Sequence, residues 1–198
     1  MELLFNKKVS QALLLMLNSF NCFKRVHYDT ITFYFSLYKN GVPGSGKSSF
    51  RSISTVQVHE NKTSNLPIKI ISSDYELAFN SLVKIDKRSF HLPLIDFNYH
   101  SFDEIFKSAL NEIKEKYPGK IYIFYSGRSF HGYHDILLSE NHWKQYLGDL
   151  LLLNKTYATE EIVDSRWIGH SLKQGFSSLR ITYNTKAYLM KPKFKCVF

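Results

Sequence analysis

Residues 30–38 alternate strictly between apolar and polar side chains, which is the period of a strand with one buried face. Residues 49–58 are rich in β-branched side chains and predict a second strand. The Gly- and Ser-rich stretch between them, residues 41–48, is typical of a turn, so we expect a hairpin. Ahead of this hairpin, the spacing of apolar residues over 3–23 predicts a helix.

The rest of the chain mixes helical and strand patterns. Residues 101–117 have the clearest helical period, which Ser101 and Glu104 open as a capping box and a Pro-Gly step ends. Residues 121–125 are continuously apolar and predict a buried strand, with residues 130–138 returning beside it. The other predicted elements are helices over 74–83, 139–150 and 166–174, strands over 68–71 and 92–97, and a hairpin of strands 179–183 and 187–190.

This order of elements predicts one α+β domain, residues 1–198, with mixed or antiparallel sheets and flanking helices. Residues 1–90 supply the N-terminal helix and hairpin, and residues 91–198 carry the polar motifs. The 44% hydrophobic and 16% aromatic content is enough for a sizeable core, which excludes disordered and fibrous proteins. The longest apolar run, residues 12–17, is far shorter than the roughly 20 residues of a membrane span.

Two cysteines are too few for a disulfide framework or a Cys-rich zinc site. We therefore expect a cytoplasmic protein without structural zinc and without a membrane partner.

The formal net charge is +9, and the positive charge gathers at one end of the chain. Residues 165–198 hold seven Lys and Arg side chains and no Asp or Glu, with Trp167, Tyr183 and Tyr188 among them. Cations displace counterions from nucleic-acid phosphates and aromatic rings stack on bases, so this segment suits a polyanion. A solvated basic surface is the alternative explanation.

One short motif points to a different class of protein. Residues 41–48, with Lys47 and Ser48 at their end, fit the phosphate-loop pattern, whose amides and lysine bind nucleotide phosphates. That mechanism needs a helix directly after the Ser, because the helix N-terminus helps to hold the anion. A strand is predicted there instead, so a P-loop nucleoside triphosphatase is the least favoured hypothesis.

Three separated segments carry chemically active side chains next to predicted strands. These side chains are Asp96 and Asn98, then Ser126, Arg128 and His131, and finally Asp164, Arg180 and Lys186. Ordinary structural roles also fit some of them, since Asp164 can cap a helix and a Ser-Gly turn can simply close a hairpin.

In this order the segments resemble the motifs of the archaeo-eukaryotic primase (primase-polymerase) superfamily, particularly its compact bacterial primase-like members. The family pattern is a strand-end carboxylate pair, a Ser-Gly turn leading to a His, a further strand-end Asp, and an Arg before a Thr-x-Asn-x-Lys stretch. The resemblance covers residues 90–190. It implies an RRM-like catalytic core and a metal-dependent nucleotidyltransferase, a DNA or RNA primase-polymerase.

The resemblance also implies roles for single residues. Asp96, Asn98 and Asp164 would ligate Mg²⁺ or Mn²⁺, and Asp96, Asp164 and His131 would be catalytic. The nucleoside triphosphate would be bound by Ser126, Arg128, His131, Arg180 and Lys186. The implied partners are a single-stranded DNA or RNA template and, in a larger assembly, a helicase or an accessory primase domain.

Asn98 and Ser129 depart from the family pattern, which has a second carboxylate and a second Gly at these positions. An amide oxygen can ligate a metal ion but brings no negative charge for bridging two. The alternative hypothesis is therefore a catalytically impaired primase-like module that binds single-stranded nucleic acid or a nucleotide.

Overall fold

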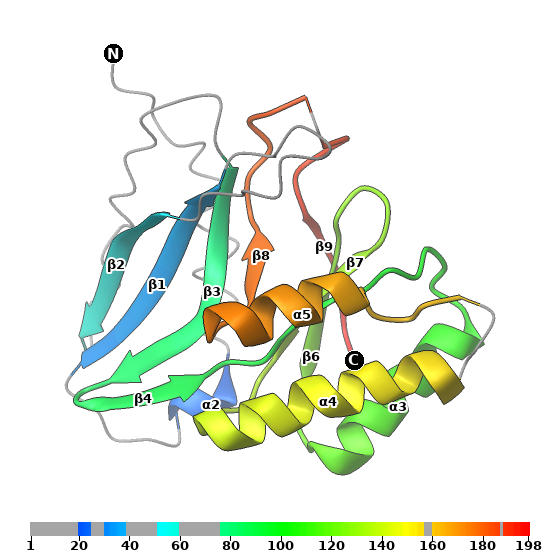
Figure 1. Cartoon of the computed structure of the whole chain (residues 1–198), viewed down its shortest axis with the longest axis horizontal. Helices are drawn as coiled ribbons and strands as arrows, with labels where there is room; N and C mark the ends of the chain where they lie inside the picture. The colour runs from blue at the N-terminus through cyan, green and yellow to red at the C-terminus, as the bar shows by residue number, and fades with distance from the viewer. Residues whose placement is uncertain (1–19, 25–29, 39–50, 60–75, 157–159, 187) are drawn as a thin grey trace.

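The computed structural model describes residues 20–24, 30–38, 51–59, 76–156, 160–186 and 188–198 (Figure 1). The described helices are α2 (Asn21–Lys24), α3 (Glu104–Lys116), α4 (Glu140–Thr156) and α5 (Ser165–Gln174). The described strands are β1 (Thr30–Tyr38), β2 (Arg51–His59), β3 (Glu76–Ile85), β4 (Arg88–His91), β5 (Leu94–Asp96), β6 (Ile121–Tyr125), β7 (Phe130–His134), β8 (Ser178–Arg180) and β9 (Lys193–Val197).

The strands form two sheets, and every described pair is antiparallel. One sheet has the order β2-β1-β3-β4, with β8 pairing β3, and the other has the order β5-β7-β6-β9. The hairpin predicted from residues 30–38 and 49–58 is confirmed as β1 and β2, and that from 121–125 and 130–138 as β6 and β7. The expected α+β class, with antiparallel sheets and flanking helices, is confirmed.

Two apolar cores lie on opposite faces of the second sheet. Successive side chains of a strand point to opposite faces. Tyr122 and Phe124 of β6 therefore join the core shared with the first sheet, whereas Ile121 and Ile123 join the core shared with α3, α4 and α5. Residues 121–124 of β6 are buried on both faces of the sheet, which explains why they are apolar at every position.

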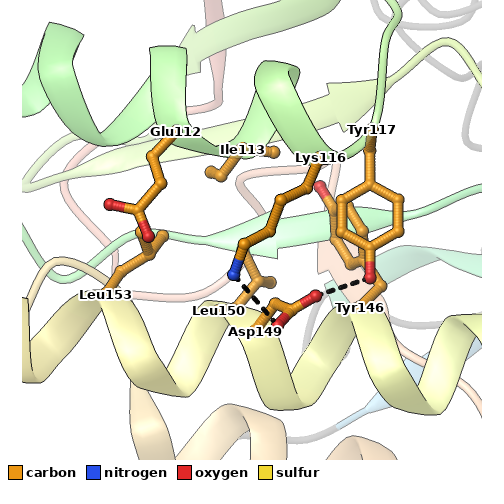
Figure 2. A pocket seen from close by; sticks show the side chains of 8 residues that line it. All are labelled: Glu112, Ile113, Lys116, Tyr117, Tyr146, Asp149, Leu150 and Leu153. Atoms are coloured by element: carbon orange, nitrogen blue, oxygen red, sulfur yellow. Dashed lines mark hydrogen bonds and ion pairs between the residues drawn. The ribbon is translucent and has the colours of Figure 1, made fainter.

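α3 and α4 pack against each other beside the core that they share with the second sheet. Asp149 of α4 accepts hydrogen bonds from Lys116 Nζ at 3.2 Å and from the Tyr117 hydroxyl at 2.7 Å (Figure 2). Burial and this hydrogen bond raise the pKa of Tyr117 above its usual range. The contacts bridge the helices across a pocket lined by Glu112, Ile113, Lys116, Tyr117, Tyr146, Asp149, Leu150 and Leu153.

Aspartate side chains cap the N-termini of two helices. Asp103 caps α3 by accepting from an amide at 3.1 Å, whereas the sequence predicted the cap at Ser101. Asp164 caps α5 by accepting from the Trp167 amide at 2.9 Å. α5 ends at Gly175, whose φ of 79° lies in the left-handed region that favours glycine. The helix predicted in this place is confirmed.

The prediction of a helix over residues 74–83 is wrong. Residues 76–85 form β3, which pairs with β1, β4 and β8. Leu77, Phe79 and Val83 are buried in the core between the sheets. Three partner strands and this burial outweigh a local helical spacing.

The predicted C-terminal hairpin is also wrong. β8 ends at Arg180 and pairs with β3, and the next strand is β9, which pairs with β6. β9 is an edge strand in which Lys193 and Lys195 are exposed, so its charged positions hid it from a search for apolar alternation. β4 was not predicted either.

Three predictions lie wholly or mainly outside the described residues. They are the helix over 3–23, of which only residues 20–23 are described, the phosphate-loop motif at 41–48 and the strand over 68–71. Within the described part of the chain, no helix is long and apolar enough to cross a membrane.

Candidate functional site

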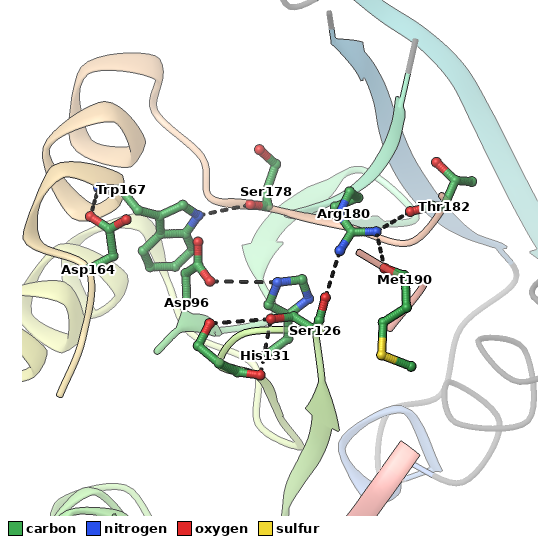
Figure 3. Close-up of polar contacts among 10 residues, drawn as sticks. Asp96, Ser126, His131, Asp164, Trp167, Ser178, Arg180, Thr182 and Met190 are labelled. Carbon is green, nitrogen blue, oxygen red and sulfur yellow. Dashed lines mark hydrogen bonds and ion pairs between the residues drawn. The ribbon is translucent and has the colours of Figure 1, made fainter. Parts of the chain in front are cut away.

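Antiparallel pairing places Asp96 and His131 side by side at the end of β5. The two residues are direct partners in the β5–β7 register, and His131 Nε2 lies 3.6 Å from Asp96 Oδ1 (Figure 3). On the other side of β5, Phe97 bridges to Val163, and the Asp164 amide donates to the Asp96 carbonyl at 2.9 Å. Three predicted site residues from distant parts of the sequence are therefore neighbours.

The Asp96 carboxyl stands in an environment that disfavours its charge. Its side chain is 28% exposed, and its pKa is raised from 3.8 to about 7, with burial as the largest cause. The nearby Asp164 carboxylate also raises this pKa, and the positive charge of Arg180 opposes the rise. Among the described residues, neither aspartate forms an ion pair with a Lys or Arg. Asp96 and Asp164 are therefore two neighbouring carboxyl groups that no Lys or Arg of the described residues neutralises through an ion pair.

His131 is buried and neutral at pH 7. Burial, and after it the positive charge of Arg180, lower its pKa from 6.5 to about 3. Its Nδ1 atom has no hydrogen-bond partner among the described residues. A buried ring nitrogen without a partner is costly, so His131 carries an unmet hydrogen-bonding requirement in this structure.

The turn from Ser126 to Ser129 has all of its carbonyl oxygens occupied. The Ser126 carbonyl accepts from Arg180 Nη2 at 2.9 Å, and the Gly127 carbonyl accepts from the Tyr125 hydroxyl at 2.9 Å. The Arg128 carbonyl accepts from His100 Nδ1 at 2.7 Å. The Ser129 carbonyl accepts from the Ser126 amide at 2.9 Å and from the Ser126 hydroxyl at 3.1 Å. Gly127 has a φ of 112°, which a side chain would strain. Hydrogen bonds to its carbonyl oxygens therefore fix the conformation of this turn.

The tip of the turn consists of a buried residue, Gly127, and an exposed one, Arg128. Neither Gly127 nor Arg128 donates its amide to another described residue, and the Arg128 side chain is exposed. Successive free amides of a turn form an anion-binding concavity, and a guanidinium beside them adds charge and forked donors. Such a turn suits phosphate groups.

Arg180 is buried and fastens three chain segments together. Nη1 donates to the carbonyls of Thr182 and Met190, the latter at 3.0 Å, and Nη2 donates to Ser126 (Figure 3). The guanidinium also lies over the Tyr188 ring, 3.9 Å from its centroid. These contacts with the protein itself were not foreseen from the sequence, which predicted a phosphate contact.

Asn98 and Lys186 are both exposed but lie on different segments. Asn98 Nδ2 donates to Glu161 Oε2 at 3.2 Å, which leaves its side-chain oxygen for another partner. The sequence did not indicate Glu161, because only the pairing of residues 97 and 163 brings it beside Asn98. Lys186 follows Asn184 and Thr185, whose amides donate to Glu76.

A family model described as archaeo-eukaryotic primase 1D-like matches residues 55–193. The chain belongs to this archaeo-eukaryotic primase family. Comparison with curated proteins and with solved structures found no match. The family match includes every site residue named above, and it confirms the superfamily of primase-type nucleotidyltransferases that the sequence motifs resemble.

The primase-like site offers a small set of oxygen donors for a cation. Within the described residues, no three His, Cys, Asp or Glu side chains are grouped closely enough to hold a metal ion alone. Asp96 and Asp164, with the free amide oxygen of Asn98, come from neighbouring segments. Oxygen donors with few carboxylates suit Mg²⁺ where substrate phosphates complete its coordination. The residues present therefore fit a divalent ion that binds together with a nucleotide.

Proposed function

We propose that this primase-like chain binds a nucleoside triphosphate and a single-stranded nucleic-acid template, and adds the nucleotide to a 3′ hydroxyl. The observation that carries the proposal is the pair Asp96 and Asp164, two neighbouring carboxyl groups that form no ion pair with a Lys or Arg of the described residues. In the reaction the 3′ oxygen bonds to the α-phosphorus, the bond to the β-phosphate oxygen breaks, pyrophosphate leaves, and the hydroxyl proton passes to solvent.

Mg²⁺ or Mn²⁺ would be held by Asp96, Asp164 and the side-chain oxygen of Asn98. A divalent ion supplies positive charge that activates the attacking hydroxyl and neutralises the leaving pyrophosphate. The raised pKa of Asp96 supports this assignment, because a bound cation would relieve the repulsion between the two carboxylates.

The triphosphate would lie against the Ser126–Ser129 turn. The amide and the guanidinium of the exposed Arg128 suit its anionic oxygens. His131 is neutral and lies beside Asp96, so its ring would contribute to the site without adding charge. Arg180 positions the turn through the Ser126 carbonyl.

The test is incorporation of a labelled nucleotide on a primed and an unprimed template, with Mg²⁺ and with Mn²⁺. Asp164→Asn is the sharpest variant, because Asn caps a helix as well as Asp does and only the charge is lost. We expect activity in the wild type, its loss in Asp164→Asn, and an unchanged unfolding midpoint or a higher one. Absence of incorporation by folded wild-type protein with either ion would refute catalysis.

A specific observation favours a second candidate, a primase-like module that binds nucleotide or single strands without catalysis. Asn98 stands in place of the family's second carboxylate, and its amide is engaged by Glu161. This candidate predicts salt-sensitive binding of an oligonucleotide that survives Asp164→Asn. Activity gained by Asn98→Asp, with none in the wild type, would identify the wild type as this impaired module.

A further inference from the structure

A buried glutamate outside the predicted motifs anchors the loop that carries Lys186. Glu76, at the start of β3, is 0% exposed. Its Oε2 accepts from the Thr182 hydroxyl at 2.6 Å, and its Oε1 accepts from the Asn184 amide at 2.9 Å and from the Thr185 amide and hydroxyl at 2.7 and 2.9 Å. One carboxylate thus receives four hydrogen bonds from a single short loop.

Among the described residues, the anchor consists of hydrogen bonds. Among the described residues, no Lys, Arg or His forms an ion pair with Glu76. A buried carboxylate is costly unless hydrogen bonds replace its hydration, so the loop and the carboxylate stabilise each other. Thr182 is fixed twice, because its oxygen also accepts from the Leu77 amide at 2.8 Å.

The same loop is connected to the turn that suits phosphates. Arg180 donates to the Thr182 carbonyl and to the Ser126 carbonyl. Glu76, Thr182, Arg180 and Ser126 therefore form one continuous series of hydrogen bonds between the loop and the turn.

The anchored loop presents two side chains to solvent. Tyr183 is 51% exposed, although its neighbour Thr182 is 4% exposed, and Lys186 is exposed three residues later. A ring and a cation on a fixed loop have the chemistry that stacks on a base and neutralises a phosphate of the same strand.

We propose that residues 182–186 form a contact for single-stranded nucleic acid, in which Tyr183 stacks on a base, Lys186 neutralises a phosphate, and Glu76 is the positioning residue. The inference rests on the proposed function. It adds to that function a base-stacking residue and the element that holds it.

The first experiment measures binding of a fluorescent single-stranded oligonucleotide to the full chain over a range of salt. We expect Tyr183→Ala to weaken binding about tenfold and Tyr183→Phe to retain it, because stacking needs the ring and not the hydroxyl. Lys186→Gln should reduce the slope of log affinity against log salt by about 0.7. Its matched control is Lys87→Gln. Lys87 follows the far end of the ten-residue strand β3, about 30 Å from the end that holds the loop. The salt slope of Lys87→Gln should equal that of the wild type.

The second experiment removes parts of the anchor. Thr185→Val deletes one hydroxyl donor to Glu76 and keeps the amide donor, so the chain should fold and bind the oligonucleotide several-fold more weakly. Glu76→Gln keeps one acceptor oxygen and should restore much of the binding lost in Glu76→Ala. In an active protein, these changes should raise the KM for template more than they lower kcat.

The results separate this inference from the proposed function. If the wild type binds the oligonucleotide and Tyr183→Ala binds it equally well, the loop contact is refuted while the proposed function stands. If the wild type binds no oligonucleotide at any salt concentration, both are refuted. If Lys87→Gln changes the salt slope as much as Lys186→Gln, the charge effect is general and the loop is not the contact.

Discussion

Replacing Asp96 by Asn should stabilise the folded protein at pH 8 while it removes the proposed metal ligand. The folded environment raises the pKa of Asp96 from 3.8 to about 7, mainly through burial and then through Asp164. At about 1.4 kcal/mol for each tenfold change in acidity, this difference corresponds to about 4 kcal/mol. The side chain is 28% exposed, so solvent screens part of the effect and about 2 kcal/mol is expected.

The pH dependence of this effect has a definite sign. Between pH 4 and 7 the folded protein binds a proton at Asp96 that the unfolded chain has released, so the contribution of Asp96 to stability falls as pH rises. Above pH 7 both states are ionised and the whole cost is present. Asn cannot ionise, so the advantage of Asp96→Asn should be largest at pH 8 and smaller at pH 5.

The assay is urea unfolding of the wild type and Asp96→Asn at pH 5 and pH 8 without divalent ions. With a slope of about 2 kcal/mol per molar urea, the variant's midpoint should be about 1 M higher at pH 8. Glu115→Gln, an exposed change on α3, serves as the control and should shift neither midpoint. A variant that is no more stable than the wild type at pH 8, or whose advantage is equal at both pH values, would refute the reasoning.

Three further predictions concern Asp135, Gly127 and the proposed metal ligand Asp164. Asp135→Ala should cost about 1–2 kcal/mol in urea unfolding, because its buried carboxylate accepts from two amides at the start of α2, at 2.8 and 2.9 Å. Gly127→Ala should cost about 1–2 kcal/mol and weaken nucleotide binding measured by calorimetry, since φ is 112° and the new Cβ would lie 3.1 Å from Met190 Cγ. Mn²⁺ should raise the thermal midpoint of the wild type at pH 8 and raise it less in Asp164→Asn, and equal shifts would exclude Asp164 as a ligand.

The elements that could be predicted from the sequence are those whose burial follows from their own side chains. Ile31, Phe33 and Phe35 of β1 and residues 121–124 of β6 are buried apolar side chains, and both apolar patterns are visible locally. β3 was mistaken for a helix because two of its three partner strands, β1 and β8, are distant in the sequence, and β8 comes about a hundred residues later.

The candidate site also contains residues that the sequence indicated and residues that it did not. Asp96, His131 and Asp164 were found because their motifs recur in a family in a fixed order. Glu76 could not be found in this way, because its partners Thr182 and Thr185 are 106 and 109 residues away, and no local pattern marks such a contact.

The environment of Arg180 explains how a basic C-terminal segment can leave a carboxylate unneutralised nearby. Arg180 opposes the rise in the pKa of Asp96, yet it forms no ion pair with it, because its guanidinium is held by the carbonyls of Ser126, Thr182 and Met190. Residues 165–198 contain no carboxylate of their own, and Glu76 from β3 supplies the one that fixes Thr182. Glu76 therefore helps to keep Arg180 on the carbonyls, and Asp96 is left without an ion pair to Arg180, so that a bound metal ion could stabilise its charged form.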